Sequence, residues 1–287
     1  MAAADDDGVV SVAHLLTVLR SVGSMVDPHE LLTLAVDIAR EAGALARTRR
    51  GEGVAIAATK SALADIVTDA DREVEALIRA RLAGARPGDG FLGEETDAER
   101  GTSGVTWVVD PIDGTVNYAY GIAHYAVSIA AVTGEPVSAK WMPVAGAVYD
   151  PSLDEMFSAS LGGGAWLGET RLAVGAPSPA GALLATGFGY DPATHEGDLA
   201  RVRRVMPLAR DLRRAGAASL DLAYVAAGRL DGYFERGLHP WDHAAGGLLV
   251  TEAGGRIGGQ PGDAPGRDMT IAAGPELYEQ ISEAVYR

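Results

Sequence analysis

The chain has 287 residues, a net charge of −15 at pH 7 and no cysteine. This length fits one large domain or two fused halves. The lack of cysteine excludes disulfides, thiolate zinc sites and every phosphatase with a cysteine nucleophile. The acidity argues against nucleic-acid partners, which are held by clustered Lys and Arg. It is compatible with a small phosphorylated substrate, because bound cations can invert the local field.

The sequence predicts no membrane partner, because no stretch reaches the roughly 18 uninterrupted apolar residues of a membrane span. The apolar segment 12–26 follows Asp5-Asp6-Asp7 and contains Arg20. It lacks the basic start of a signal peptide. We therefore expect a cytoplasmic protein.

Hydrophobic periodicity predicts the elements in chain order, after an N-terminal extension of residues 1–27. In the half 28–170 we expect a helix to about residue 50, strands at 54–58 and 65–68, a helix from 69 to about 83, and strands at 90–93, 105–110, 125–132, 142–149 and 156–159. In the half 171–287 we expect a strand at 182–188, a helix at 196–210, a strand at 212–214, a helix at 218–228, a strand at 231–235, a helix at 242–253, a strand at 269–273 and a helix from 275.

The segment from Trp107 to Thr115 carries the strongest chemical signal. An apolar, β-branched run leads to Asp110 and Asp113, and Gly114 follows them. Burying adjacent carboxylates without a partner costs several kcal/mol. A hard divalent cation would compensate them, and the Gly-Thr amides offer a nest for an anion beside it. The alternative is an ordinary Asp-Pro turn at the end of a strand.

Acidic side chains lie at the ends of predicted elements at three other places in the sequence. Glu94 and Glu95 follow a glycine at a strand end. Asp71 lies in the first turn of a helix, and Asp242 follows Trp241 at the start of another. Each has a plain alternative explanation, namely a solvated turn, a helix-dipole partner or a helix-start residue. Their joint occurrence with the double-aspartate motif favours one shared site.

Motifs spread along most of the chain combine into a recognisable pattern. They are Lys60-Ser61…Asp65…Thr68…Asp71, Gly93-Glu94-Glu95, Asp110-Pro111-Ile112-Asp113-Gly114-Thr115-Val116-Asn117, Gly216-Ala217-Ala218-Ser219-Leu220-Asp221-Leu222, Ala227-Gly228-Arg229-Leu230-Asp231-Gly232 and Trp241-Asp242…Ala244-Ala245-Gly246. This combination resembles the inositol monophosphatase family over about residues 28–287. The resemblance implies an α+β fold, a layered αβαβα sandwich, and a homodimer.

The resemblance also implies a magnesium site. One Mg²⁺ would be held by Glu94, Asp110 and the carbonyl of Ile112, and a second by Asp110, Asp113 and Asp242. Carboxylates and one carbonyl form an all-oxygen set that suits this ion. Only a fold that joins residues 94, 110–113 and 242 can build such a site, so the resemblance predicts a long-range contact between the halves.

Catalytic and substrate-binding roles follow from the same resemblance. Thr115, oriented by Asp71, would act together with Glu94 on a water activated by the metal. Lys60 is either a metal-associated lysine or an exposed turn lysine. The residues implied in substrate binding are Asp113, Gly114, Thr115, Ala218 and Glu235.

The implied function is Mg²⁺-dependent hydrolysis of a phosphate monoester of a small polyol, with myo-inositol 1-phosphate as the first choice. Histidinol phosphate is the main competitor, because an acidic pocket also suits an ammonium group. A non-catalytic regulator that reuses the fold is a further alternative. An aspartyl-phosphate mechanism is disfavoured, since its signature places the aspartates two residues apart and Asp110 and Asp113 are three apart.

Overall fold

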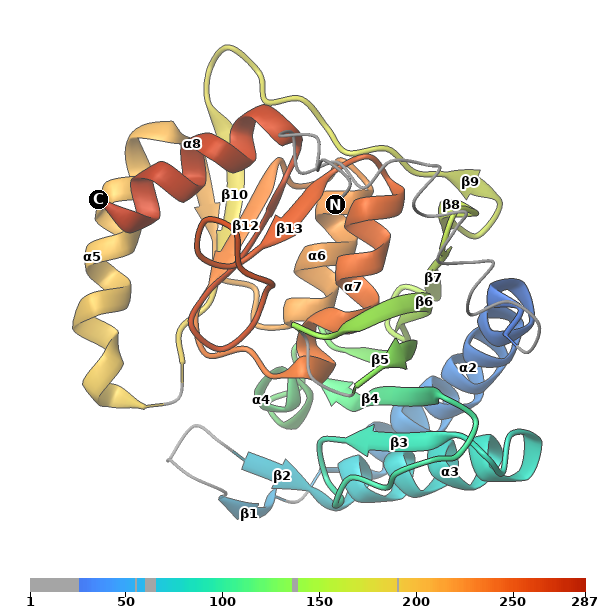
Figure 1. The fold of residues 1–287 in the computed structure, drawn as a ribbon. Coiled ribbons are helices and arrows are strands. Elements are labelled where there is room, and N and C mark those ends of the chain that lie inside the picture. Colours follow the sequence, from blue (N-terminus) through green and yellow to red (C-terminus); the bar gives the residue numbers. More distant parts are fainter. Residues whose placement is uncertain (1–25, 55, 60–65, 136–138, 190) are drawn as a thin grey trace, which may run out of the picture.

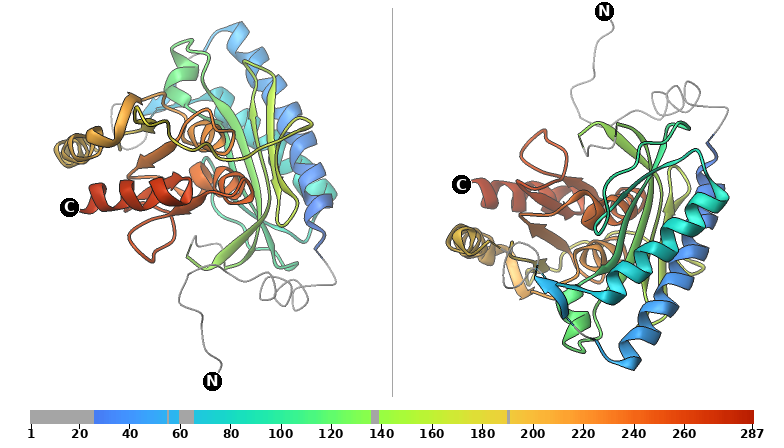
Figure 2. Two further views of the ribbon diagram at one scale, coloured as in Figure 1. Left: turned by 90° about the horizontal axis from the view of Figure 1, so that it is seen from above. Right: turned by 90° about the horizontal axis from the view of Figure 1, so that it is seen from below.

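The computed structural model describes residues 26–54, 56–59, 66–135, 139–189 and 191–287 (Figure 1). The N-terminal extension and Lys60 lie outside these residues. Two layers of sheet alternate with three layers of helix (Figure 2), in agreement with the αβαβα sandwich expected from the sequence.

Helices α2 (Pro28–Glu52) and α3 (Asp69–Ala85) form the first outer layer. Asp27 begins α2 by accepting a hydrogen bond from the His29 N–H at 2.8 Å, and Pro28 fits the first helical position. The face of α2 that includes Ala35 and Ile38 is fully buried against the first sheet. A two-stranded ribbon, β1 (Ile56–Thr59) and β2 (Ile66–Thr68), connects the two helices.

The first sheet has seven strands in the order β3-β4-β5-β6-β7-β8-β9. Strands β3 and β4 are parallel, and the other neighbours are antiparallel. Nearly every residue of β5 is buried, because helices cover both faces of the sheet (Figure 2). The strands are β3 (Gly90–Gly93), β4 (Val105–Asp113), β5 (Ala126–Gly134), β6 (Trp141–Asp150), β7 (Glu155–Ser160), β8 (Gly164–Leu167) and β9 (Thr170–Arg171).

The second sheet has five strands in the order β11-β10-β12-β14-β13. Strand β10 is parallel to both of its neighbours, and β14 is antiparallel to both of its own. Helices α5 (His195–Val205) and α8 (Pro275–Tyr286) lie on its outer side (Figure 2). The strands are β10 (Ala182–Thr186), β11 (Ala209–Arg213), β12 (Gly232–Glu235), β13 (Arg256–Gly258) and β14 (Thr270–Ala273).

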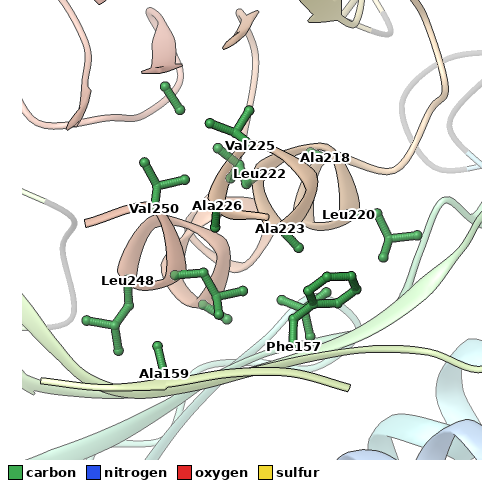
Figure 3. Close-up of a cluster of buried hydrophobic side chains, with 14 of the residues drawn as sticks. Phe157, Ala159, Ala218, Leu220, Leu222, Ala223, Val225, Ala226, Leu248 and Val250 are labelled. Atoms are coloured by element: carbon green, nitrogen blue, oxygen red, sulfur yellow. The ribbon is translucent and has the colours of Figure 1, made fainter. Parts of the chain in front are cut away.

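Helices α6 (Ala218–Ala226) and α7 (Pro240–Glu252) form the middle layer between the sheets. Both are apolar around most of their circumference, as expected of helices with no solvent-facing side. Figure 3 shows Leu222 and Leu248 in the same cluster of buried side chains as Phe157. The helices approach so closely that a Cβ on Gly246 would lie 2.6 Å from the Cβ of Leu222. This layer joins both sheets into one core.

The sequence predicted most elements within a few residues, with one clear error. The helix expected at 196–210 ends at Val205, because Pro207 cannot continue it, and a short 3-10 turn at 206–208 leads into β11. The strand expected at 212–214 is β11 and already begins at Ala209. The division into units 28–170 and 171–287 stays a prediction. The short elements β8, β9, β13 and α4 (Thr115–Ala119) were not expected from the sequence.

Candidate active site

Two aspartates lie at a bulge that ends β4. Asp110 pairs with Ser128 and Asp113 with Ala126, so three steps along β4 face two along β5. Pro111 lies inside this bulge, where its missing N–H costs no ladder hydrogen bond. The Ile112 N–H donates instead to Asp110 Oδ1 at 3.1 Å. The bulge therefore holds both carboxylates at one end of a buried strand.

The start of α7 brings a third carboxylate from far along the chain. Asp242 accepts a hydrogen bond from the His239 N–H at 2.6 Å, which closes the first turn of the helix. The carbonyl of Trp241 accepts one from Ser128 Oγ at 3.3 Å, and this contact ties the helix start to β5. As a result, carboxylate oxygens of Asp110, Asp113 and Asp242 lie within 4.8 Å of one another.

Glu94 belongs to the same electrostatic environment. It follows β3, whose last residue, Gly93, pairs with Val109 of β4. The negative charge of Glu94 contributes to the raised pKa values of both Asp110 and Asp242. The long-range contact expected from the sequence is therefore present between Asp110, Asp113 and Asp242, and Glu94 is close enough to act on Asp110 and Asp242 electrostatically.

The carboxylate cluster (Asp110, Asp113 and Asp242) holds more negative charge than a protein interior tolerates unaided. Burial, followed by repulsion from the neighbouring carboxylates, raises the pKa of Asp110 and of Asp242 well above the usual range. Burial likewise raises the pKa of Asp113 to about 6. A divalent cation would relieve this repulsion, and the all-oxygen donor set fits Mg²⁺.

A hydroxyl–carboxylate pair lies beside the carboxylate cluster. Thr115 Oγ1 donates to Asp71 Oδ1 at 3.2 Å and lies 3.1 Å from the carbonyl oxygen of Ile112. Thr68 fixes the other oxygen of Asp71 through its N–H at 2.8 Å and through its hydroxyl. Burial raises the pKa of Asp71 to about 6. The hydrogen bond between Thr115 and Asp71 is the contact that the expected orienting role of Asp71 requires, and the role itself stays a prediction.

Gly114 connects the bulge to α4 in a conformation that favours glycine. Its φ is 89°, and a Cβ there would meet the carbonyl oxygen of His124 at 3.0 Å. Asn117 holds the same region together by donating to the carbonyls of His124 at 2.8 Å and Ala215 at 2.9 Å. The backbone at Gly114 and Thr115 is thus held in a fixed position next to the carboxylates.

The start of α6 holds Asp113 from the other half of the chain. Asp113 Oδ2 accepts from the Ser219 N–H at 2.7 Å and from the Ser219 hydroxyl at 2.5 Å. Asp113 Oδ1 accepts from the Ala218 N–H at 3.3 Å. The amide of Ala218, which the resemblance assigns to substrate, therefore faces Asp113 in this structure. Ser219 was not singled out from the sequence.

Glu235 ends β12 on the second sheet. Its Oε2 accepts a hydrogen bond from the Tyr233 hydroxyl at 2.5 Å. The carboxylate packs so closely on Gly187 that a Cβ there would lie 1.9 Å from Oε2. Burial raises the pKa of Glu235 to about 7, although the charge of Arg214 acts in the opposite direction. Asp221, on α6, contributes a further buried carboxyl whose pKa is raised well above its usual range by burial and by Glu235.

A carboxylate beneath the Glu94 turn was also missed from the sequence. Glu75, on α3, is fully buried, and its Oε2 accepts from the Glu95 N–H at 2.9 Å. A Cβ at Gly93 would lie 2.3 Å from the same oxygen, so the glycine leaves room for the Glu75 carboxylate. Glu75 thus holds the turn that carries Glu94.

Comparison with known proteins decides the family. The model described as "Inositol monophosphatase family" matches residues 27–287. The chain belongs to the inositol monophosphatase family. This membership confirms the resemblance inferred from the sequence motifs.

Individual members of the family are similar over most of their length. The protein named Inositol-1-monophosphatase SuhB of Mycobacterium tuberculosis is 41% identical over 285 residues, which cover 91% of this chain and 95% of that protein. The Nus factor SuhB of Haemophilus influenzae is 41% identical over 230 residues, which cover 79% and 84%. The crystal structure of the extragenic suppressor protein suhB from Bartonella henselae aligns with a TM-score of 0.83 at 36% identity, covering 90% of this chain and 99% of that one. This structural match confirms the α+β layered fold.

No helix in the described part of the chain combines the length and the apolar character needed to cross a membrane.

Proposed function

We propose that this chain hydrolyses phosphate monoesters of small polyols in a Mg²⁺-dependent reaction, with myo-inositol 1-phosphate as the preferred substrate. The observation that carries the proposal is the carboxylate cluster, whose oxygens lie within 4.8 Å of one another, beside the Thr115–Asp71 hydrogen bond. Membership of the family supports the same reaction class. Neither feature alone would specify hydrolysis of a phosphate ester.

The residues proposed to hold Mg²⁺ are those expected from the sequence, namely Glu94, Asp110, the Ile112 carbonyl, Asp113 and Asp242. When bound, Mg²⁺ neutralises charge on phosphate oxygens and makes an attacking water more acidic. The fixed amides of Gly114 and Thr115 are the proposed donors to a phosphate oxygen.

The Thr115–Asp71 pair is the proposed route for the proton of the attacking water. Because the Thr115 hydroxyl donates to Asp71, its lone pairs remain available to accept a hydrogen bond from water. The ionised Asp71 can in turn take up the proton that Thr115 relays. Glu94 is the proposed second carboxylate that orients this water.

Glu235 is proposed to recognise the hydroxyls of the substrate. A carboxylate accepts two hydroxyl hydrogen bonds, and Tyr233 already fixes one of its oxygens. This chemistry favours a neutral polyol. An ammonium group would also be attracted, so histidinol phosphate remains the alternative substrate. The amide of Ala218 and the side chain of Lys60 are proposed as further contacts to the substrate and metal, respectively.

The direct test is release of inorganic phosphate from myo-inositol 1-phosphate and histidinol phosphate at one Mg²⁺ concentration. We expect turnover of the inositol ester to be faster, to require Mg²⁺ and to stop when EDTA is added. Faster turnover of histidinol phosphate would change the substrate assignment. No phosphate release from any polyol phosphate in excess Mg²⁺ would refute the proposed activity.

A regulatory role is the second candidate, because one similar protein is named Nus factor SuhB. A regulator without activity is expected to have lost a metal-binding carboxylate or the threonine. This chain retains Glu94, Asp110, Asp113, Asp242 and the Thr115–Asp71 pair. We therefore propose that catalysis persists whether or not a second role exists.

We further propose a homodimer in the cytoplasm. The chain has a mass of 29.6 kDa, so light scattering of the purified full chain should give twice this value. A single-chain mass across the working concentration range would contradict the dimer.

A further inference from the structure

The contacts of Asp113 suggest how this site distinguishes between cations. A carboxylate oxygen has two lone pairs directed in the carboxylate plane. Asp113 Oδ2 accepts two hydrogen bonds from one residue, the Ser219 N–H at 2.7 Å and the Ser219 hydroxyl at 2.5 Å. Asp113 Oδ1 accepts a longer hydrogen bond from the Ala218 N–H, at 3.3 Å, and the backbone N–H of Leu220 also donates to this carboxylate. The two oxygens are therefore unequally available to a metal.

Water cannot loosen these contacts easily. Ser219 is fully buried and Asp113 is 7% exposed. The Ser219 hydroxyl must donate to Asp113, since an ionised carboxylate only accepts. The N–H of the same residue is fixed by the start of α6, so the hydroxyl and amide hold Oδ2 from one rigid helix turn.

We propose that the Ser219 hydroxyl restricts Asp113 to binding a cation through one oxygen, and so makes the site selective for Mg²⁺ over Ca²⁺. Mg²⁺ requires about six ligands in near-octahedral geometry, whereas Ca²⁺ accepts six to eight and often binds both oxygens of a carboxylate. A carboxylate with one oxygen occupied suits the smaller ion. Ser219 is thus a specificity-determining residue that acts through Asp113. This inference rests on the proposed metal-dependent function.

The test measures binding of Mg²⁺ and Ca²⁺ separately to the full-length chain by calorimetry, without substrate. In Ser219→Ala, Oδ2 regains a lone pair and two-oxygen binding becomes accessible. We expect the ratio of the Ca²⁺ to the Mg²⁺ dissociation constant to fall by about threefold to tenfold, the effect of one hydrogen bond. Ser219→Cys, which fills the volume with a weak donor, should shift the ratio in the same direction.

Ser282→Ala is the matched control, because Ser282 is also a buried serine but lies on α8. It should keep the ratio of the unmodified protein. An unchanged ratio in both Ser219 variants, with melting temperatures near that of the unmodified chain, would overturn the role of Ser219 alone. Failure of the unmodified chain to bind either ion would overturn the metal-dependent function and this inference with it.

Discussion

Replacing Asp71 by Asn would reverse one hydrogen bond beside the carboxylate cluster. The two donors of Thr68 fix the oxygen of residue 71 that faces them, so the amide oxygen of Asn must take that place. The amide NH₂ then faces Thr115 and donates to it. One of the two Thr115 lone pairs is then used, and the Thr115 proton points towards the Ile112 carbonyl, 3.1 Å away. A water near Thr115 keeps at most one lone pair to donate to, and no carboxylate behind Thr115 can take up the proton.

The expected loss follows from the role of the lost proton acceptor. Positioned proton transfer contributes about 10²–10⁴ in rate, so kcat should fall by about that factor in Asp71→Asn. Burial raises the pKa of Asp71 to about 6, so kcat of the unmodified protein should decline as pH falls through about 6. The variant should lack this decline, because Asn does not titrate.

The free energy of unfolding of Asp71→Asn should rise, although its kcat falls. Since the folded-state pKa of Asp71 is raised to about 6, the carboxylate becomes increasingly unfavourable as pH rises through that value. The cost at pH 8 is about 3 kcal/mol. Asp71→Asn removes this cost, although the reversed hydrogen bond offsets about 1 kcal/mol of it. Its free energy of unfolding at pH 8 should therefore be higher than that of the unmodified chain.

The assay is a pH profile of phosphate release together with urea unfolding at pH 8. Asp69→Asn serves as the control, since this neighbouring aspartate is exposed and should change neither quantity. If Asp71→Asn retained near-normal turnover and the decline below pH 6, the proton route through Thr115 would be wrong. If Asp71→Asn instead lowered the free energy of unfolding at pH 8, the loss of activity would point to a purely structural role of Asp71.

Three further changes test other parts of the site. Asp110→Asn and Asp242→Asn should each nearly abolish turnover, and near-normal rates in both would refute the ligand assignment. Each variant should also raise the melting temperature in EDTA, because the crowded carboxylates repel one another when no metal is bound. Glu235→Gln should raise KM for myo-inositol 1-phosphate more than it lowers kcat, and an unchanged KM would exclude Glu235 from the substrate site. The same variant should raise the free energy of unfolding at pH 8 by about 3 kcal/mol, since burial raises the Glu235 pKa to about 7. In urea unfolding, Glu75→Ala should lose about 2 kcal/mol because it removes the carboxylate that accepts from the Glu95 N–H, whereas Glu75→Gln keeps an acceptor and should lose much less. Equal losses in the two variants would contradict this anchoring role.

The sequence was informative where chemistry and periodicity agree. The apolar run before Asp110 predicted a buried strand. The free-energy cost of burying two carboxylates at the end of this strand predicted that they bind a cation together. The resemblance supplied the distant partners, Glu94 and Asp242. The structure brings Asp242 together with Asp110 and Asp113, and the charge of Glu94 acts on Asp110.

Other features could not be predicted because they depend on distant contacts. Ser219 hydrogen bonds to a residue 106 positions away, and nothing in its neighbours signals this partner. Glu75 lies on the buried face of α3, three residues before Ile78. Its charge nevertheless suggests an exposed side chain, and the turn after Gly93 that covers it was not expected. The predicted end of the helix at residue 210 was wrong for a local reason. The apolar spacing continues through Leu208, but Pro207 ends the helix. Short strands such as β9 lack enough residues for any period to show.

The central claim is that carboxylates from distant parts of the chain bind a common metal. Crystals of the full chain soaked in Mn²⁺, which has a measurable anomalous signal, would locate the ion directly. We expect a peak within about 2.5 Å of oxygens from Asp110, Asp113 and Asp242. Mn²⁺ bound elsewhere, with no peak among these three side chains, would contradict the claim.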